Sequence, residues 1–138
     1  MRLRIAVGSR SLAVVAGLYA TGLLTPAAAQ APSLAMLSAL DDGQWELRFR
    51  DGRESRRVCV RSGLELIQLQ HSSQGCSRFV VEDGASQVTV QYTCKGNGYG
   101  RTNIRREGSD LVQIDSQGIA GGLPFSFSAE ARRVGPCR

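Results

Sequence analysis

The feature that most constrains the fold of this chain is a two-residue alternation of apolar and polar side chains. The alternation is clearest over residues 87–94, and a second run over residues 45–50 separates apolar from charged side chains in the same way. The apolar side of the first run consists of Val88, Val90, Tyr92 and Cys94. Because this is the period of a β-strand with one buried face, we expect the chain to form antiparallel strands.

Turn signals divide the alternating runs into hairpins. Asp51-Gly52 and Asp83-Gly84 each stand between two expected strands, and Asp-Gly is a strong signal for a tight β-hairpin turn. Further glycines indicate a turn near residues 96–100 and a connection over residues 118–124. The sequence therefore predicts seven strands, over residues 43–50, 54–60, 77–82, 87–94, 101–106, 111–116 and 123–132.

Residues 63–70 break the alternation and are predicted to form one short helix. Ser62 and Glu65 precede and open it with the spacing of a capping box. Each expected strand has one apolar face that needs cover, which an open, flat sheet would not provide. The predicted fold is mainly β, a curled antiparallel meander sheet or partial barrel with the helix at one end, and closure into a barrel is left open.

The N-terminal segment has the composition of an export signal. Residues 1–10 are basic, residues 11–24 are apolar and uncharged, and small residues precede Gln30. We predict a signal peptide over residues 1–29, cleaved after Ala29; an uncleaved anchor is the alternative. Residues 30–42 then form a leader with a helical turn, and residues 43–138 form a single domain. The apolar run is shorter than the roughly 20 residues that span a membrane, so no transmembrane segment is expected in the mature chain.

The net charge of +5 depends largely on that signal. Three of the 17 Lys and Arg residues lie in it and none of the 12 acidic residues do, which leaves +2 for the mature chain. Acidic and basic side chains also interleave along residues 41–54 instead of forming a basic cluster. A domain that binds nucleic acid usually has a clustered basic face, so we expect no nucleic-acid partner.

All four cysteines of the chain, Cys59, Cys76, Cys94 and Cys137, lie in the predicted mature part. An even number in a small exported chain predicts two disulfides, whereas a zinc site would place its ligands closer together in the sequence. We prefer Cys59–Cys76 with Cys94–Cys137, because the first bridge would clasp the predicted helix. In the alternative, Cys76 and Cys94 face each other across a hairpin and leave Cys59 to pair with Cys137.

Several short motifs together resemble those of a known exported family. They are Gly43-Gln44-Trp45-Glu46 at the first strand, the four cysteines in order, Tyr92-Thr93-Cys94-Lys95-Gly96, and the closing Gly135-Pro136-Cys137. In these motifs the chain resembles the proteobacterial family called domain of unknown function 3617, over about residues 43–137. The resemblance implies a β-rich envelope or periplasmic protein without an assigned activity or catalytic residue. The chain lacks the Met- and Pro-rich stretch that follows the first strand in many members.

The sequence offers little for catalysis. His71 is the one histidine, and we interpret it as a solvated loop residue beside Ser72 and Ser73. Asp41-Asp42 is interpreted as a surface turn, because neighbours on an extended chain point apart. Residues 95–100 are interpreted as a hairpin loop, since a strand and not a helix is expected after them. We predict no enzymatic activity, no cofactor and no metal site.

Two groups of residues are candidates for binding. Arg101 and Arg105 alternate onto one face of their strand and form a possible anion-binding pair for lipid headgroups, glycans or an acidic protein. Aromatic residues on the apolar faces form either a packed core or the lining of a pocket: Trp45, Phe49, Tyr92, Phe125 and Phe127. We therefore predict a non-enzymatic binding module, periplasmic or secreted, for an envelope component or protein. The alternative is a carrier of a small hydrophobic ligand or lipid inside the curled sheet.

Overall fold

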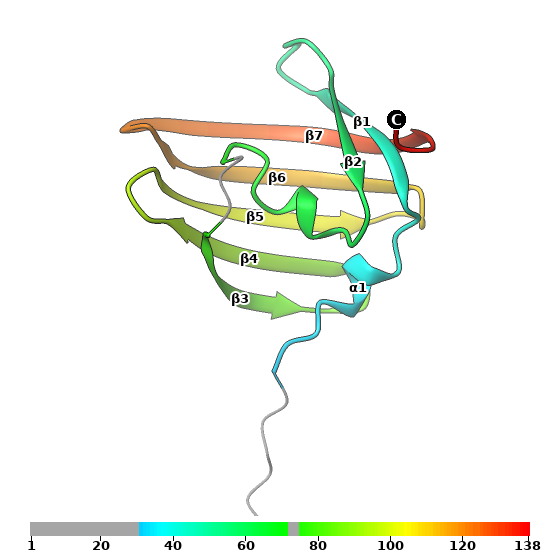
Figure 1. Cartoon of the computed structure of the whole chain (residues 1–138), viewed down its shortest axis with the longest axis horizontal. Coiled ribbons are helices and arrows are strands. Elements are labelled where there is room, and N and C mark those ends of the chain that lie inside the picture. The colour runs from blue at the N-terminus through cyan, green and yellow to red at the C-terminus, as the bar shows by residue number, and fades with distance from the viewer. Residues whose placement is uncertain (1–30, 72–74) are drawn as a thin grey trace, which may run out of the picture. The chain divides into compact units, whose positions relative to one another are not determined.

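A computed structural model describes residues 31–71 and 75–138 (Figure 1). The predicted signal peptide and the serines beside His71, Ser72 and Ser73, lie outside the described residues. The elements in chain order are α1 (Ala35–Ser38), β1 (Gly43–Phe49), β2 (Arg56–Val60), the 3-10 turn η1 (Leu64–Leu66), β3 (Ser77–Asp83), β4 (Gln87–Cys94), β5 (Gly98–Arg106), β6 (Leu111–Ala120) and β7 (Leu123–Gly135).

The seven strands form one antiparallel sheet in the order β2-β1-β7-β6-β5-β4-β3, which confirms the predicted fold class. Strands β3 to β7 follow one another in the sheet as a meander. β1 pairs with β7, the last strand of this meander, and not with β3. In that pairing Leu47 lies opposite Ala131 and Phe49 opposite Ala129, so small side chains on β7 leave room for large ones on β1. Because β2 and β3 are the two edges, the sheet is not closed into a barrel.

The predicted hairpins agree with the structure in position but not always in length. The connection at Asp51-Gly52 is longer than the expected tight turn, because β1 ends at Phe49 and β2 begins only at Arg56. Asp83-Gly84 ends β3, where the Gly84 N–H donates to the Gln87 carbonyl. The expected connection over residues 118–124 is only the pair Gly121-Gly122, and both have positive φ angles, 56° and 79°. Two residues with positive φ match the twist of a two-residue hairpin, which lets β6 continue as far as Ala120.

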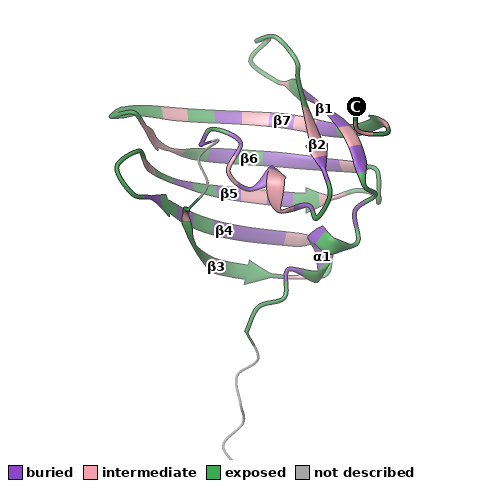
Figure 2. Ribbon diagram, viewed as in Figure 1, coloured by how far each residue is buried: buried purple, intermediate pink, exposed green. Residues whose placement is uncertain are grey.

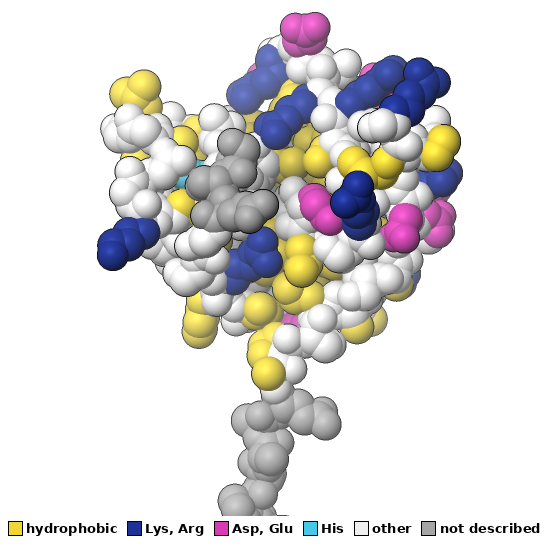
Figure 3. Space-filling model, viewed as in Figure 1, with side chains coloured by type: hydrophobic (Ala, Val, Ile, Leu, Met, Phe, Trp, Pro, Cys, Tyr) yellow, Lys and Arg dark blue, Asp and Glu magenta, His cyan; other side chains and the backbone are white. Residues whose placement is uncertain are grey.

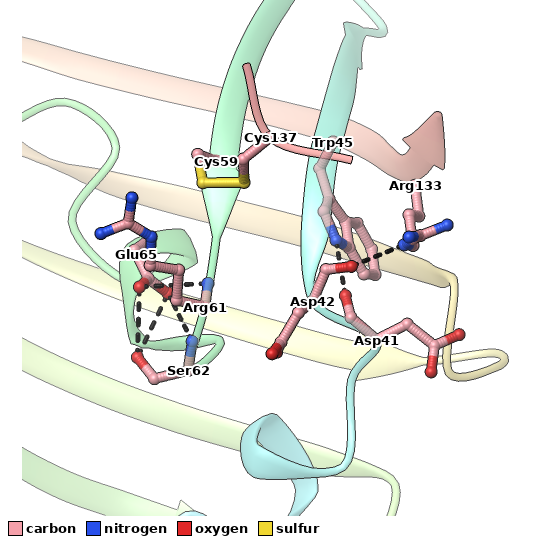
Figure 4. Close-up of a disulfide and its surroundings, with 9 residues drawn as sticks. All are labelled: Asp41, Asp42, Trp45, Cys59, Arg61, Ser62, Glu65, Arg133 and Cys137. Carbon is pink, nitrogen blue, oxygen red and sulfur yellow. Dashed lines mark hydrogen bonds between the residues drawn. A yellow bond between two sulfur atoms is a disulfide. The ribbon is translucent and has the colours of Figure 1, made fainter. Parts of the chain in front are cut away.

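The helix predicted over residues 63–70 is wrong, because the structure holds only one 3-10 turn there, η1. The Glu65 carboxylate does turn back to accept from the N–H groups of Arg61 and Ser62, but the Ser62 hydroxyl bonds to Glu65 instead of capping a helix (Figure 4). After η1 the Ile67 carbonyl accepts from the Thr102 hydroxyl on β5, at 2.6 Å. That tertiary bond takes the carbonyl that a continuing helix would have used.

The α-helix of the described chain is instead in the predicted leader. α1 and its flanks bury Leu34, Met36, Leu37 and Leu40, and the Asp83 carboxylate accepts from the N–H groups of Ser33 and Leu34. Residues 31–138 accordingly form one compact unit, to which the leader contributes core side chains.

The core lies on the concave face of the sheet. The β2–β3 connection crosses this face, and Figure 2 shows buried positions along the middle of β4 to β7 behind it. The largest fully buried side chains come from the sheet, the connection and α1: Trp45, Tyr92, Leu37, Leu47, Leu66, Ile67, Ile104, Ile114, His71, Val60, Val88 and Val90. Their burial provides the cover that the apolar strand faces require.

The four cysteines form Cys59–Cys137 and Cys76–Cys94, so the preferred pairing was wrong and the alternative is correct. Ser77 pairs with Thr93 in the β3–β4 ladder, which brings the adjoining Cys76 and Cys94 opposite each other. The helix that Cys59–Cys76 was expected to clasp does not form. After β7 the chain passes the start of β1 and reaches Cys59 on β2, as Figure 4 shows.

Candidate binding surface on the outer face of the sheet

The side chains of β5 divide between the two faces of the sheet as the sequence predicted. Thr102 and Ile104 are buried on the concave side, whereas Arg101 and Arg105 are exposed on the outer side with Asn103 between them. The pattern that indicated a common face for the two arginines is therefore present in the structure.

A hollow of about 430 Å³ lies on this outer face, near the end of the sheet that holds the β6–β7 turn. Its lining comes from β4, β5, β6 and β7: Gln91, Tyr99, Gly100, Arg101, Gln117, Gly118, Ile119, Phe125 and Ser126. We call it the outer hollow. Its volume is within the range of about 300–1,000 Å³ that is usual for small-ligand pockets.

Strand register explains which side chains meet there. Gln91 pairs with Arg101, Arg101 pairs with Gln117, and Gln117 pairs with Ser126, so these four side chains form one row across four strands. Tyr99 pairs with Ile119 in the next row toward the turn.

Two glycines between these rows contribute only backbone to the hollow. Gly100 pairs with Gly118, and a Cβ atom on Gly100 would overlap the Tyr92 hydroxyl on the concave side. A Cβ atom on Gly118 would overlap the Tyr99 carbonyl and touch the Phe125 ring. Packing inside the sheet thus requires glycine at both positions.

The two candidate arginines differ in their partners. The Arg105 guanidinium forms an ion pair with Glu107, with 3.0 Å between Nη1 and Oε1. Arg101 makes no side-chain hydrogen bond or ion pair with any residue in the described part of the chain, and it lines the outer hollow. Of the predicted pair, Arg105 is therefore neutralised by Glu107, whereas the guanidinium of Arg101 is available to bind an anion.

The aromatic candidates lie mainly in the core. Trp45, Tyr92 and Phe127 are buried, and the Trp45 Nε1–H donates to the Asp41 carbonyl at 3.0 Å. Phe49 is half-buried with its ring centroid 5.4 Å from that of Phe127, and the Arg53 guanidinium covers its other side. Phe125 is also half-buried and is the member of this group that lines the outer hollow.

His71 is not the solvated loop residue that we expected, because its side chain is only 1% exposed. Nε2 lies 3.1 Å from the Asn97 carbonyl and 3.0 Å from the Ile119 carbonyl, while Nδ1 faces the Tyr92 hydroxyl. Two carbonyls can only accept, so Nε2 carries the proton and Nδ1 accepts from Tyr92. Both ring nitrogens are thereby engaged. His71 is buried because the β2–β3 connection crosses the concave face of the sheet. No local sequence pattern indicates this crossing.

The remaining sequence motifs lie at turns and loops. Asp41 and Asp42 use their backbone carbonyls to accept from Trp45 and Arg133, as Figure 4 shows. The hairpin loop expected over residues 95–100 is shorter in the structure and covers only residues 95–97, because β5 already begins at Gly98.

A second group of basic side chains gathers over the β1–β2 hairpin, on the face seen in Figure 3. The exposed arginines of this hairpin include Arg53 and Arg56. Arg53 is paired with Asp51, and Arg56 donates to the Leu69 carbonyl at 2.6 Å. These two cations are therefore committed to contacts within the protein, unlike Arg101.

Within residues 31–71 and 75–138, no helix is long and apolar enough to cross a membrane. No cluster of three or more His, Cys, Asp or Glu side chains in these ranges could hold a metal ion. Comparisons with known protein families, curated proteins and solved structures find no match to the chain.

Proposed function

We propose that this protein is an exported, non-enzymatic binding module that attaches to a component of the cell envelope through the outer hollow. The observation that carries the proposal is the guanidinium of Arg101, which lines the outer hollow of about 430 Å³ and makes no side-chain hydrogen bond or ion pair with the described residues. A guanidinium is a planar fork of donors that matches a carboxylate or phosphate, and it remains charged at any physiological pH.

Two features support export as part of this proposal. Two disulfides in a domain of this size are typical of proteins that fold in an oxidising compartment, such as the periplasm. The resemblance to the family called domain of unknown function 3617, which implies an envelope or periplasmic location, belongs to the proposal as well.

The carrier alternative requires space inside the curl of the sheet. The concave side is instead occupied by side chains such as Trp45, Leu47 and Ile67, all with no exposed surface. This filling of the concave side favours a binding module over a carrier.

Co-sedimentation with the envelope fraction of the producing cell tests the proposal. The exported protein and two variants, Arg101→Gln and Arg105→Gln, are mixed with the envelope fraction at low salt, and the bound fraction is measured. Both substitutions remove one exposed positive charge from the same strand, so they are matched in net charge. We expect Arg101→Gln to weaken binding about tenfold and Arg105→Gln to leave it within about twofold, because, of these two arginines, only Arg105 has an ion-pair partner among the described residues. Equal binding of the two variants, or no binding of the unmodified protein, would contradict the proposal.

A further inference from the structure

We infer that the outer hollow binds a saccharide that carries a carboxylate group. This inference rests on the proposed function and names the chemical class of its ligand. It follows from a difference between two parts of the outer face, from the shape of the hollow and from its charge.

Most polar side chains on the outer face are bonded to one another. Gln113 bonds to Arg50, Glu107 and Glu130, and Gln87 bonds to Glu82. A second row of side chains lies between the row of Gln87 and Gln113 and the hollow. In this second row Asn103 bonds to Thr89, and Ser128 bonds to Asp115. This part of the sheet surface satisfies its own donors and acceptors.

The next row of side chains, which lines the hollow, leaves its donors and acceptors without protein partners. Its four side chains stand side by side in register but make no side-chain hydrogen bonds or ion pairs with the described residues: Gln91, Arg101, Gln117 and Ser126. We call them the unbonded row. Two amides and a guanidinium supply planar groups with several donors and two acceptors, while a hydroxyl adds one of each. A polyhydroxylated ring presents the same mixture of donors and acceptors, so it complements the row.

An apolar strip adjoins the unbonded row. Tyr99 is 51% exposed, and Ile119, which pairs with it, is half-buried. A tyrosine ring offers a flat apolar surface with one polar end. One face of many sugar rings consists of C–H groups, and such a face can pack against this ring while the hydroxyls at the rim reach the unbonded row.

The charge of the site favours one carboxylate. Arg101 is the one cation of the lining, and a guanidinium binds a carboxylate through two parallel hydrogen bonds. Asp115 lines an adjoining hollow together with Arg101 and would repel a ligand of higher negative charge. An anionic membrane surface is usually bound by clusters of several basic residues, which this lining lacks.

The size of the lining favours a saccharide over a protein partner. The nine residues that line the hollow are well below the roughly 20–30 residues that each side of a stable protein interface contributes. One or two sugar units would fill the hollow, and its open form would allow a longer chain to continue across the sheet.

Titration calorimetry with defined oligosaccharides tests this inference. The probes are short oligomers of galacturonic and glucuronic acid, together with their methyl esters, which keep the sugar and remove the charge. We expect the unmodified protein to bind the acids. Arg101→Gln should weaken binding of the acids about tenfold and leave the esters within about twofold, because only the acids use the guanidinium fork.

Tyr99→Ala probes the apolar part and should weaken binding of the acids and the esters alike, by about fivefold. Arg105→Gln is the matched control and should bind both as the unmodified protein does. All three positions are exposed, so thermal unfolding should change little and confirms that each variant is folded. Unchanged affinity in both Arg101→Gln and Tyr99→Ala would overturn the site.

The two experiments distinguish a failure of the saccharide inference from a failure of the proposed binding function. If the envelope fraction binds in an Arg101-dependent manner while none of the acidic oligosaccharides binds at millimolar concentration, the saccharide inference is wrong and the binding module stands. If neither binds, both proposals are wrong.

Discussion

The Nδ1 atom of His71 lies 3.0 Å from the hydroxyl oxygen of Tyr92, and both side chains are buried on the concave face of the sheet. Tyr92 belongs to β4, whereas His71 belongs to the β2–β3 connection. The other ring nitrogen donates to carbonyls of Asn97 and Ile119. One imidazole therefore joins the connection to β4, to the β4–β5 turn and to β6.

We predict that His71→Ala lowers the free energy of unfolding by about 3 kcal/mol, because it removes one donor from each of two carbonyls and opens a cavity. Tyr92→Phe should lower it by about 1 kcal/mol. Urea unfolding of both variants and of the double variant measures their coupling. The double variant should lose less than the sum of the single losses, by at least about 0.5 kcal/mol; simple additivity would show that the contact is not formed.

The alkaline limb of the stability curve should depend on Tyr92. Burial raises the pKa of its phenol above the ordinary value of 10.0, and a hydrogen bond with Ser116 partly opposes this. The folded state thus holds this proton more tightly than the unfolded chain. The stabilisation is complete at neutral pH and declines as pH rises past the ordinary value toward the raised one. Urea unfolding between pH 8 and pH 11.5 should show a steeper decline for the unmodified protein than for Tyr92→Phe, and parallel curves would refute the assignment.

The two disulfides should differ in their contribution to stability. Cys59–Cys137 joins residues 78 apart and Cys76–Cys94 residues 18 apart. Because a longer closed loop restricts the unfolded chain more, replacing both cysteines by alanine should cost about 4.5 kcal/mol for the first bridge and about 3 kcal/mol for the second. Denaturant unfolding compares the two double variants, and the reverse order would contradict the entropic explanation.

The pairing itself can be read from a tryptic digest without reduction. Trypsin would release residues 58–61 and residues 134–138 as short peptides. We expect mass spectrometry to find these two linked, with residues 62–78 linked to residues 79–95. A link between residues 58–61 and 62–78 would instead indicate the Cys59–Cys76 pairing.

Gly118 should tolerate substitution less well than a glycine in a turn. A Cβ atom at Gly118 would overlap the backbone of β5, so Gly118→Ala should cost about 2–3 kcal/mol through strand displacement. Gly52 has a φ of 78° with open space around it, and Gly52→Ala should cost only about 1 kcal/mol of backbone strain. Thermal unfolding of both variants measures the two losses of stability. Equal losses would mean that β5 and β6 can shift apart at little cost in free energy.

Export predicts a specific N-terminus. If the signal is cleaved after Ala29, the protein recovered from the periplasm or medium begins at Gln30. Intact-mass measurement should give a chain of 109 residues that is lighter by a further four hydrogen atoms, two for each disulfide. Detection of Met1 in the exported protein would exclude cleavage.

Local pattern was sufficient for the strands and for the side of the sheet on which each side chain lies. The alternation over residues 87–94 matches β4, and the placement of Arg101 and Arg105 on a common outer face follows from the same period. The turn at Asp83-Gly84 was also predicted correctly from the sequence. These features depend on residues close in the sequence, because the pleat and the turn are properties of a few consecutive residues.

The partners across the sheet were decided only by the tertiary structure. The sequence by itself determined the strands, their faces and an even set of cysteines. It did not determine that β1 lies beside β7, that Cys59 bonds to Cys137, that the segment after Ser62 leaves the helix to cross the sheet, or that His71 is buried. The same holds for the unbonded row, since Arg101 is available only because the side chains that register places beside it, Gln91 and Gln117, carry no charge to pair with it. Such contacts join residues far apart in the chain, so they depend on which elements the whole core brings together and not on any local period.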